Sequence, residues 1–231
     1  MLRTKKVVPC LFVSLVLLLV TLPVWGASKA DDEETIRNAA AVLQAMLASN
    51  DVPRSVLEKA DCILILPSVK KFAVGIGGTG GRGPMSCRGG SGFTGKWSPP
   101  AMFSIGGASA GLQLGGKAVD YVIAIMSPTA VEKVLSGKVK VGTDVSAAAG
   151  PGASAPTNST ADMLTYSRSS GLFAGVSLDG ASLSPDSDAN QRLYGKPATA
   201  REIVSGSGVT ATTAGQSLVA LLDSKAGKHV Q

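Results

Sequence analysis

The sequence predicts an α+β fold, in which helices near both ends of the chain pack on a mainly antiparallel, barrel-like β-sheet. Three observations support this prediction. Apolar residues recur every three to four positions after residue 34 and again over residues 213–225, which is typical of amphipathic helices. Between these segments, apolar residues alternate with polar or small ones, as they do in strands. An order of helices, many strands and helices again is typical of an α+β domain.

The first helix is predicted to begin at the acidic residues 31–34 and to end near Ser49. Acidic side chains are favourable there because they face the positive end of the helix dipole. The apolar stripe of this helix consists of Ile36, Ala39, Ala40, Leu43, Met46 and Leu47. A second, short helix is predicted to follow, capped by Asp51, with Pro53 in its first turn and its end near Ala60.

The middle of the chain is predicted to form strands. Residues 63–66 are expected to be a short buried strand that Pro67 stops, and residues 72–76 another. Ten glycines over residues 75–95 predict strand ends, bulges and a turn. Alternation over residues 102–126 predicts further strands.

The remaining elements alternate between short helices and short strands. In chain order, the first are a helix over residues 129–135 that Gly137 ends, alternating valines from Val139 to Val145, and a small-residue loop over residues 150–160. They are followed by a hairpin formed by residues 164–168 and 172–178, a helical turn over residues 186–194 and a last helix over residues 213–225.

Residues 1–26 are predicted to be the signal peptide of an exported protein. Arg3, Lys5 and Lys6 precede an almost wholly apolar segment, and small residues follow it, which is the order of a secretory signal. Cleavage after Gly26 and cleavage after Ala30 both fit, and an uncleaved N-terminal anchor is the alternative. The apolar core is shorter than the roughly 20 residues that a spanning helix needs, which favours cleavage. The expected location is periplasmic or extracellular, with peripheral attachment to a membrane.

Composition excludes several classes of function. The chain has 231 residues, with 22 Lys and Arg, 16 Asp and Glu, and one histidine, His229, close to the C-terminal end. A single histidine in that place argues against a His-ligated metal site and against Ser-His or Cys-His catalysis. Removal of the signal peptide would take away three of the six net positive charges, which leaves too few for a typical nucleic-acid-binding protein. We therefore expect no metal, no cofactor and no nucleic acid.

Two cysteines, Cys62 and Cys87, each lie at the end of a predicted strand. In an oxidising compartment such a pair can form a disulfide, and two buried free thiols are the alternative.

Two short motifs resemble catalytic or nucleotide-binding signatures, but their surroundings do not fit. Residues 75–80 match G-x-G-x-x-G, yet Gly81-Arg-Gly-Pro84 cannot open the helix that a dinucleotide site needs. Residues 107–111 match G-x-S-x-G around Ser109, yet strand alternation continues past the motif and no suitable histidine base is present. At the first motif we expect a strand and turn whose glycines permit positive φ or close backbone approach, and we keep a serine hydrolase at Ser109 only as a remote hypothesis.

From Asp61 onward, long and ordered segments resemble one known family. They comprise residues 62–78, 104–116 and 164–180, followed by Asp188-Ala-Asn190 and Leu193-Tyr-Gly195. These segments resemble the bacterial exported branch of the lipid-binding SYLF-domain family. Eukaryotic members of this family are described as actin-binding modules of endocytic proteins. Ser170 departs from the arginine that is common in the bacterial branch. The expected organisation is a signal peptide, a SYLF-like domain over residues 31–205 with the N-terminal helices, and a C-terminal helix and tail over residues 206–231.

The resemblance implies no enzymatic activity. It implies binding of acidic membrane lipids, in which an amphipathic N-terminal helix and basic residues take part. We therefore expect a non-catalytic, exported domain that recognises acidic phospholipid headgroups at a membrane surface. A structural or protein-interaction module of the cell envelope, with envelope proteins as partners, is the alternative. Actin is not an expected partner, because a bacterial envelope lacks it.

The candidate lipid-binding residues are cations from a stretch that contains no acid between Asp61 and Asp120. They are Lys70, Lys71, Arg82, Arg88 and Lys96. The candidate membrane-contact residues are Ile36, Leu43, Met46, Leu47 and Trp97. The alternatives are a solvated loop rim for the cations and packing on the core for the helix stripe.

Overall fold

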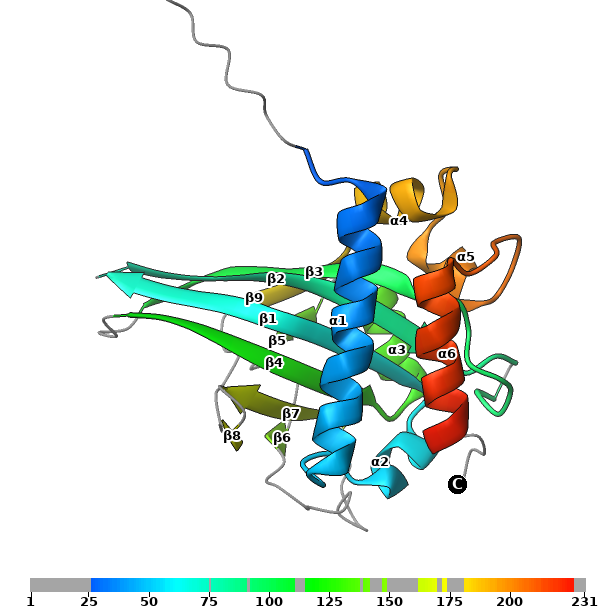
Figure 1. The fold of residues 1–231 in the computed structure, drawn as a ribbon, viewed down its shortest axis with the longest axis horizontal. Helices are drawn as coiled ribbons and strands as arrows, with labels where there is room; N and C mark the ends of the chain where they lie inside the picture. The colour runs from blue at the N-terminus through cyan, green and yellow to red at the C-terminus, as the bar shows by residue number, and fades with distance from the viewer. Residues whose placement is uncertain are drawn as a thin grey trace, which may run out of the picture.

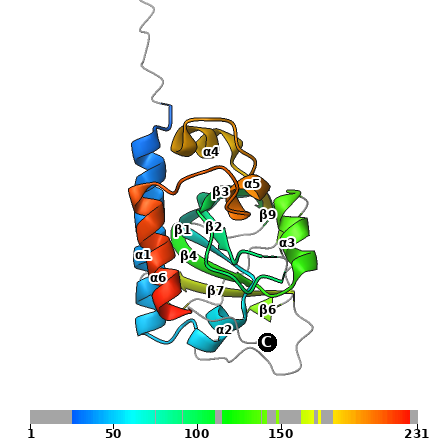
Figure 2. The same cartoon turned by 90° about the vertical axis from the view of Figure 1, so that its right-hand side faces the viewer.

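Two layers of helices enclose a sheet of nine strands in the computed structural model (Figures 1 and 2). The structure describes residues 26–74, 76–90, 92–110, 115–137, 139–141, 147–148, 162–169, 172–173 and 181–226. The strands are β1 (Cys62–Val74), β2 (Ile76–Cys87), β3 (Ala101–Ala110), β4 (Gly115–Ile125), β5 (Val139–Val141), β6 (Ala147–Ala148), β7 (Met163–Ser169), β8 (Leu172–Phe173) and β9 (Ala181–Pro185). The helices are α1 (Lys29–Ala48), α2 (Arg54–Lys59), α3 (Pro128–Leu135), α4 (Ser187–Tyr194), α5 (Ala200–Val204) and α6 (Thr213–Lys225).

The strand order is β5-β9-β3-β2-β1-β4-β7-β6, with β8 paired to β7. These pairs are antiparallel except β6–β7, which is parallel. Among the described residues no pairing joins β5 to β6, so the curled sheet remains an open half-barrel. The predicted α+β fold with a mainly antiparallel, barrel-like sheet and helices packed on it is confirmed.

Both faces of the sheet are buried, because β1 alternates its apolar side chains between two cores. Cys62, Leu64 and Leu66 join the cluster that α3 and α5 cover. Ile63 and Ile65 join the cluster that α1, α2, α4 and α6 cover. A continuous apolar run is the expected sequence of a strand that is buried on both sides. The C-terminal helix α6 therefore completes the same core as α1.

β1 and β2 correct the prediction of short strands in this region. β1 continues through Pro67, and its register against β4 shifts between Leu66 and Val69. Ser68, inside this bulge, has φ 51°, and its N–H donates to Asp120 Oδ1 over 2.8 Å. A bulge accommodates proline because the regular ladder of hydrogen bonds is interrupted there, so the N–H that proline lacks is not needed.

The glycines of β2 lie in a long strand and not in the predicted ends and turn. Gly83 shows why glycine is needed at one of these positions. A Cβ atom there would lie 1.9 Å from the Ile65 carbonyl oxygen, which is far inside van der Waals contact. Close backbone approach therefore occurs at Gly83, three residues beyond the motif for which it was expected, whereas a Cβ atom at Gly80, within the motif, would meet nothing within 4 Å.

Other elements follow the prediction with local corrections. Helices α3, α4 and α6 and the β7–β8 pairing are confirmed where they are described. Asp51 does not cap α2, because Pro53 holds the N-cap position; its carboxylate instead accepts from Ser49 Oγ over 2.7 Å. Helix α5 was not predicted, although Thr199 and Glu202 form a capping box at its start. The predicted loop over residues 150–160, His229 and all but the last residue of the predicted signal peptide lie outside the described residues.

A disulfide joins Cys62 and Cys87, so of the two alternatives that the sequence left open, the structure has the disulfide and not two free thiols. The two residues are register partners on β1 and β2, and both are fully buried. The bond therefore fixes the same end of the two central strands.

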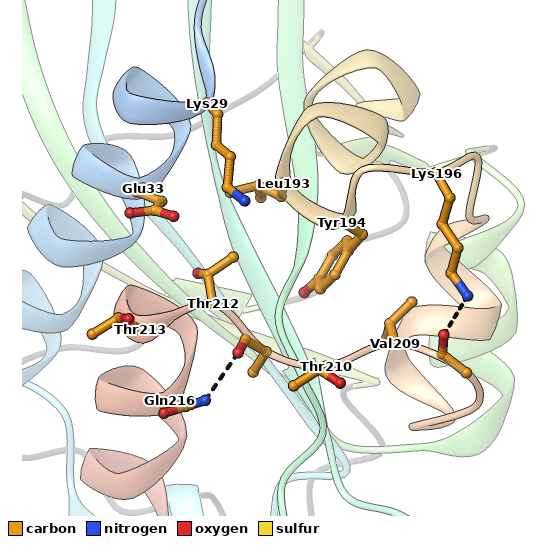
Figure 3. Close-up of a pocket in the computed structure, with 12 residues that line it drawn as sticks. Lys29, Glu33, Leu193, Tyr194, Lys196, Val209, Thr210, Thr212, Thr213 and Gln216 are labelled. Carbon is orange, nitrogen blue, oxygen red and sulfur yellow. Dashed lines mark hydrogen bonds between the residues drawn. The ribbon is translucent and has the colours of Figure 1, made fainter.

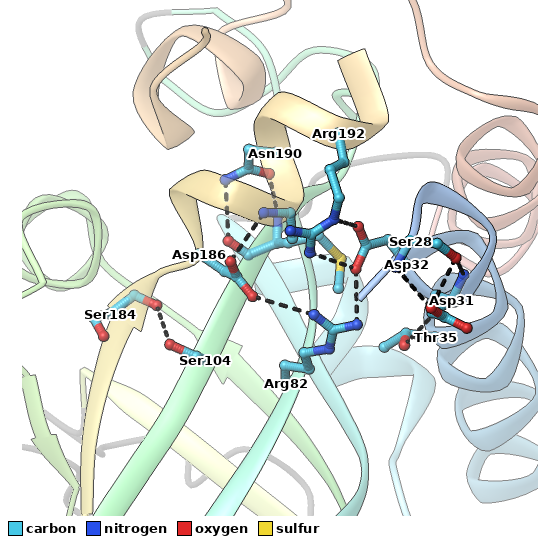
Figure 4. A network of polar contacts seen from close by, with 12 residues as sticks. Ser28, Asp31, Asp32, Thr35, Arg82, Ser104, Ser184, Asp186, Asn190 and Arg192 are labelled. Carbon is cyan, nitrogen blue, oxygen red and sulfur yellow. Dashed lines mark hydrogen bonds and ion pairs between the residues drawn. The ribbon is translucent and has the colours of Figure 1, made fainter. Parts of the chain in front are cut away.

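Helix α1 is anchored to the sheet and to α4 through one buried carboxylate (Figure 4). Asp32 is fully buried and lies 2.8 Å from Arg82 of β2. It also accepts from Arg192 of α4 over 2.7 and 3.1 Å, and this hydrogen bonding raises the pKa of Arg192. Arg82 lies 3.7 Å from Asp186 as well. Two arginines thus compensate the cost of desolvating the carboxylate, and they link α1 to β2 and to α4.

Helix α1 begins at Lys29, two residues before the predicted start. Ser28 caps it in a capping box with Asp31, whose carboxylate accepts from Ser28 N–H over 2.7 Å. This hydrogen bond lowers the pKa of Asp31.

Gly83→Ala is expected to destabilise the fold by about 3 kcal/mol or more, because the new methyl group must displace the β1 backbone. Urea unfolding followed by circular dichroism measures this change. Gly106→Ala is the matched control, since an added Cβ there meets nothing closer than 4.0 Å. Equal stability of the two variants would contradict the close approach of β1 and β2.

Asp32→Asn is expected to lower the free energy of unfolding by roughly 2 kcal/mol, because it removes the buried charge that two partly exposed arginines share. Chemical denaturation provides the measurement. The control is Glu132→Gln, which disrupts the exposed pair with Arg201 and should cost at most about 1 kcal/mol. A loss at Asp32 no larger than that of the control would show that the network does not anchor α1.

Candidate functional site

A hollow of about 530 Å³ lies between α1 and the sheet, and we name it the α1 hollow. Its wall consists of Asp31, Glu34, Thr35 and Asn38, which follow one another at helical spacing along one side of α1. Its floor includes Lys70 of β1 and Gly80, Gly81 and Arg82 of β2, with Pro67 and Ser68 of the bulge at its margin. The hollow thus brings together two of the predicted cations, Lys70 and Arg82.

The charged groups of the α1 hollow differ in how far the chain itself satisfies them. Arg82 is paired with Asp32 and Asp186, and Asp31 is held by the helix cap. The side chains of Glu34, Asn38 and Lys70, which are exposed, make no hydrogen bond or ion pair with any other described residue. The α1 hollow therefore offers one unpaired anion, one unpaired amide and one unpaired cation to a ligand.

Lys70 and Lys71 lie on opposite faces of the sheet, as successive strand residues must. Lys70 is exposed in the α1 hollow, whereas the Lys71 ammonium lies on the other face, 5.9 Å from the centre of the Tyr121 ring. Lys117 of β4 is the register partner of Lys71, so three lysines occur at neighbouring positions of two adjacent strands. Lys117 was not among the predicted lipid-binding cations, although pairing of the strand that contains Lys71 with the strand that contains Lys117 could have suggested it.

Arg88 corrects the prediction of a cationic surface around the glycines. Its side chain is 1% exposed, and burial lowers its pKa. It donates to the carbonyl oxygens of Ala60 over 3.3 Å and of Ala226 over 2.5 Å, beyond the end of α6. Arg88 is therefore a core residue that joins the sheet to α6, and it is not available to a headgroup in this structure.

Lys96 is exposed, but it lies in the loop beyond the far end of β2. Arg82 and Arg88 are six residues apart on this strand, which corresponds to about 20 Å. The five predicted cations therefore do not form a single site: Lys70 and Arg82 share the α1 hollow, and Lys71 lies behind it.

The predicted membrane-contact residues belong mainly to the core, which corrects that prediction for this conformation. Ile36, Leu43 and Met46 are fully buried under α1, and Leu47 is partly buried against the same cluster. Trp97 is 4% exposed; its ring lies 4.4 Å from the Arg88 guanidinium, and its indole N–H donates to the Ala226 carbonyl over 3.2 Å. Packing on the core was the alternative explanation for the helix stripe, and the structure supports it.

A second hollow, of about 520 Å³, lies between the start of α1, the end of α4 and the segment before α6 (Figure 3). Several of its polar groups serve the chain itself. Lys196 donates to the Gly208 carbonyl, and Gln216 donates to the Ala211 carbonyl over 3.0 Å. The Tyr194 hydroxyl donates to the Pro100 carbonyl over 2.6 Å, and burial raises its pKa. This hollow is therefore less suited to an ionic ligand than the α1 hollow.

The two catalytic-type motifs have strand surroundings in the structure. Residues 76–80 of the G-x-G-x-x-G segment lie in β2, Gly75 lies outside the described residues, and Ser109 lies within β3. Neither motif opens a helix in the part of the chain that the structure describes. Among the same residues there is no cluster of three or more His, Cys, Asp or Glu side chains suited to a metal ion. None of the described helices is both long and apolar enough to span a bilayer.

Comparison with known proteins identifies relatives of this chain. The family model described as "Ysc84: Las17-binding protein actin regulator" matches residues 106–225. An SH3 domain-containing protein of Schizosaccharomyces pombe is 35% identical over 190 residues, which cover 79% of this chain and 43% of the relative. Protein YSC84 of Saccharomyces cerevisiae is 33% identical over 205 residues, or 82% of this chain and 43% of the relative. The SH3 domain-containing YSC84-like protein 1 of Bos taurus is 32% identical over 190 residues, covering 77% and 52%.

These comparisons confirm the SYLF resemblance and correct one expectation drawn from it. The chain spans about half, or less, of the length of these three relatives, all of which are eukaryotic. The family description names an actin regulator, which argues against the expectation that actin is not a partner. From the extent of the match and the identity to its relatives, the chain belongs to the Ysc84 (SYLF-domain) family.

Proposed function

We propose that this chain is a non-catalytic binding module that docks on acidic phospholipid headgroups through the end of its sheet. The observation that carries this proposal is the position of Lys70, Lys71 and Lys117 at the end of β1 and β4. The ends of β1 and β4 project beyond α1 (Figure 1). Lys70 itself lies beside α1, where it is exposed in the α1 hollow. A membrane surface can therefore meet the projecting end of the sheet next to an exposed lysine.

Lys70 shares the α1 hollow with the acids Asp31 and Glu34, so the charge that favours an acidic surface at this end comes mainly from Lys71 and Lys117. Asp120, the nearest acid along β4, accepts from the Ser68 N–H within the bulge. A lysine near an anionic bilayer contributes about 1 kcal/mol of attraction, so two or three of them support reversible binding. Because the α1 stripe is buried in the core, the attachment would be electrostatic and would weaken with rising ionic strength.

A protein partner is the second candidate, and the family description favours it. That description names Las17 binding and actin regulation, and relatives in Saccharomyces cerevisiae are named LAS seventeen-binding protein 3. The same lysines would present their charge to an acidic face of such a partner. Binding to actin filaments and binding to vesicles can be measured side by side.

We also propose that the protein is exported. The order of charge, apolar core and small residues over residues 1–30 supports this proposal. The Cys62–Cys87 disulfide agrees with it, because such bonds persist mainly in oxidising compartments.

The double substitution Lys70→Gln and Lys71→Gln is expected to weaken binding to vesicles with anionic lipid by about 30-fold, because each lysine contributes about 1 kcal/mol. Vesicle co-sedimentation at low and high salt measures this change. The matched control is Lys59→Gln with Lys133→Gln, which removes the same charge from α2 and α3 and should leave binding nearly unchanged.

Three outcomes of that experiment would count against the lipid proposal. They are equal binding to neutral and anionic vesicles, equal losses in the two double variants, and no vesicle binding by the unaltered protein. In the last case, co-sedimentation with actin filaments that depends on Lys70 and Lys71 would favour the protein partner instead.

Expression in a secreting host is expected to yield a chain that lacks residues 1–26 or 1–30 and resists alkylation until it is reduced. Intact-mass spectrometry with and without reductant measures both features. A full-length chain with Cys62 and Cys87 readily alkylated would contradict export.

A further inference from the structure

We infer that the α1 hollow binds a phosphodiester that carries an ammonium group, the chemistry of an amino-phospholipid headgroup. This inference rests on the proposed function and deepens it, because it names the headgroup that the site selects. The lysines at the end of the sheet supply general attraction to an acidic surface. The α1 hollow adds recognition of one group on that surface.

Three side chains that line the α1 hollow have no partner among the described residues. Lys70 on the floor is a cation for a phosphate oxygen, and Asn38 on the wall has an amide N–H that can donate to the same group. Glu34, also on the wall, is an anion for an ammonium. The side chains of all three are exposed and make no hydrogen bond or ion pair with another described residue. A ligand that carries both charges can pair with Glu34 and Lys70 at once, whereas a ligand with a single charge can pair with only one of them.

The second argument is the glycine on the floor. A Cβ atom at Gly80 would meet nothing within 4 Å, and its φ lies outside the positive region that favours glycine. Glycine within a strand is less favourable than alanine, because it loses more conformational freedom on folding. Packing within the described chain therefore does not account for this glycine, whereas a ligand that approaches the backbone of β2 does.

The α1 hollow also has a size that suits such a headgroup. A volume of about 530 Å³ lies in the range of small-molecule sites. In a phosphoethanolamine or phosphoserine group, a two-carbon link holds the ammonium close to the phosphate. Such a group presents both charges to a hollow whose floor carries Lys70 and whose wall carries Glu34.

The same chemistry has two possible sources, a lipid headgroup and a free phosphodiester. NMR titration of the purified protein with sn-glycero-3-phosphoethanolamine tests the chemistry without a membrane. The comparison ligand is sn-glycero-3-phosphoglycerol, which carries the same phosphodiester without the ammonium. We expect amide shifts around Glu34, Asn38 and Gly80 with the first ligand, and binding of the second that is about fivefold weaker.

Two variants with one matched control locate the site. Gly80→Ala places a methyl group on the floor and is expected to weaken binding of the phosphoethanolamine ligand by at least about fivefold. Its stability to urea should not fall, since the space is open. Gly106→Ala is the control, because Gly106 is the register partner of Gly80 on β3 but does not line the hollow. Glu34→Gln should remove the preference for the ammonium while binding of the phosphoglycerol ligand is kept.

The outcomes separate this inference from the proposed function. Equal titration by both ligands, no titration by either, or unchanged binding in Gly80→Ala would overturn the inference. Lysine-dependent binding to anionic vesicles would still support the proposed function in each of these cases. If the inference holds, vesicles that contain phosphatidylethanolamine should bind more tightly than vesicles of the same charge without it. No such difference, with titration of the soluble ligand intact, would exclude the lipid as the source.

Discussion

The buried carboxylate of Asp32 is the interaction on which the arrangement of this molecule depends. It is fully buried, and Arg82 and Arg192 approach it from β2 and α4. A buried carboxylate is stable only with such partners, so α1 has one fixed position on the sheet. That position encloses the apolar stripe of α1 in the core and places the polar side of the helix beside the floor of β1 and β2. The α1 hollow is a consequence of this arrangement.

Much of the fold could be predicted from the sequence because the signals are local. The stripe of α1, the cap of α4 at Asp186 and the period of α6 each specify an element without reference to the rest of the chain. The course of β1 could not be predicted in this way. Pro67 normally ends a strand, and it is tolerated here because Asp120 of a neighbouring strand accepts from the next N–H.

The candidate site was harder to predict, because charge along a sequence does not show which face a residue occupies. Lys70 and Lys71 are adjacent in the chain, yet they lie on opposite faces of the sheet. Arg88 resembles any other loop cation in the sequence, but it is buried against the end of α6. Glu34 and Asn38 gain significance only because α1 lies beside β1 and β2. For Cys62 and Cys87, their position at strand ends made pairing possible but did not decide between a disulfide and two free thiols.

The central claim is that an acidic bilayer meets the projecting end of β1 and β4. Paramagnetic relaxation enhancement, measured on the protein bound to anionic nanodiscs with a nitroxide-labelled lipid, tests it most directly. The account predicts the strongest broadening of amide signals around Lys70, Lys71 and Lys117, with little effect on α3. Broadening centred on α3, or along the buried stripe of α1, would contradict the account.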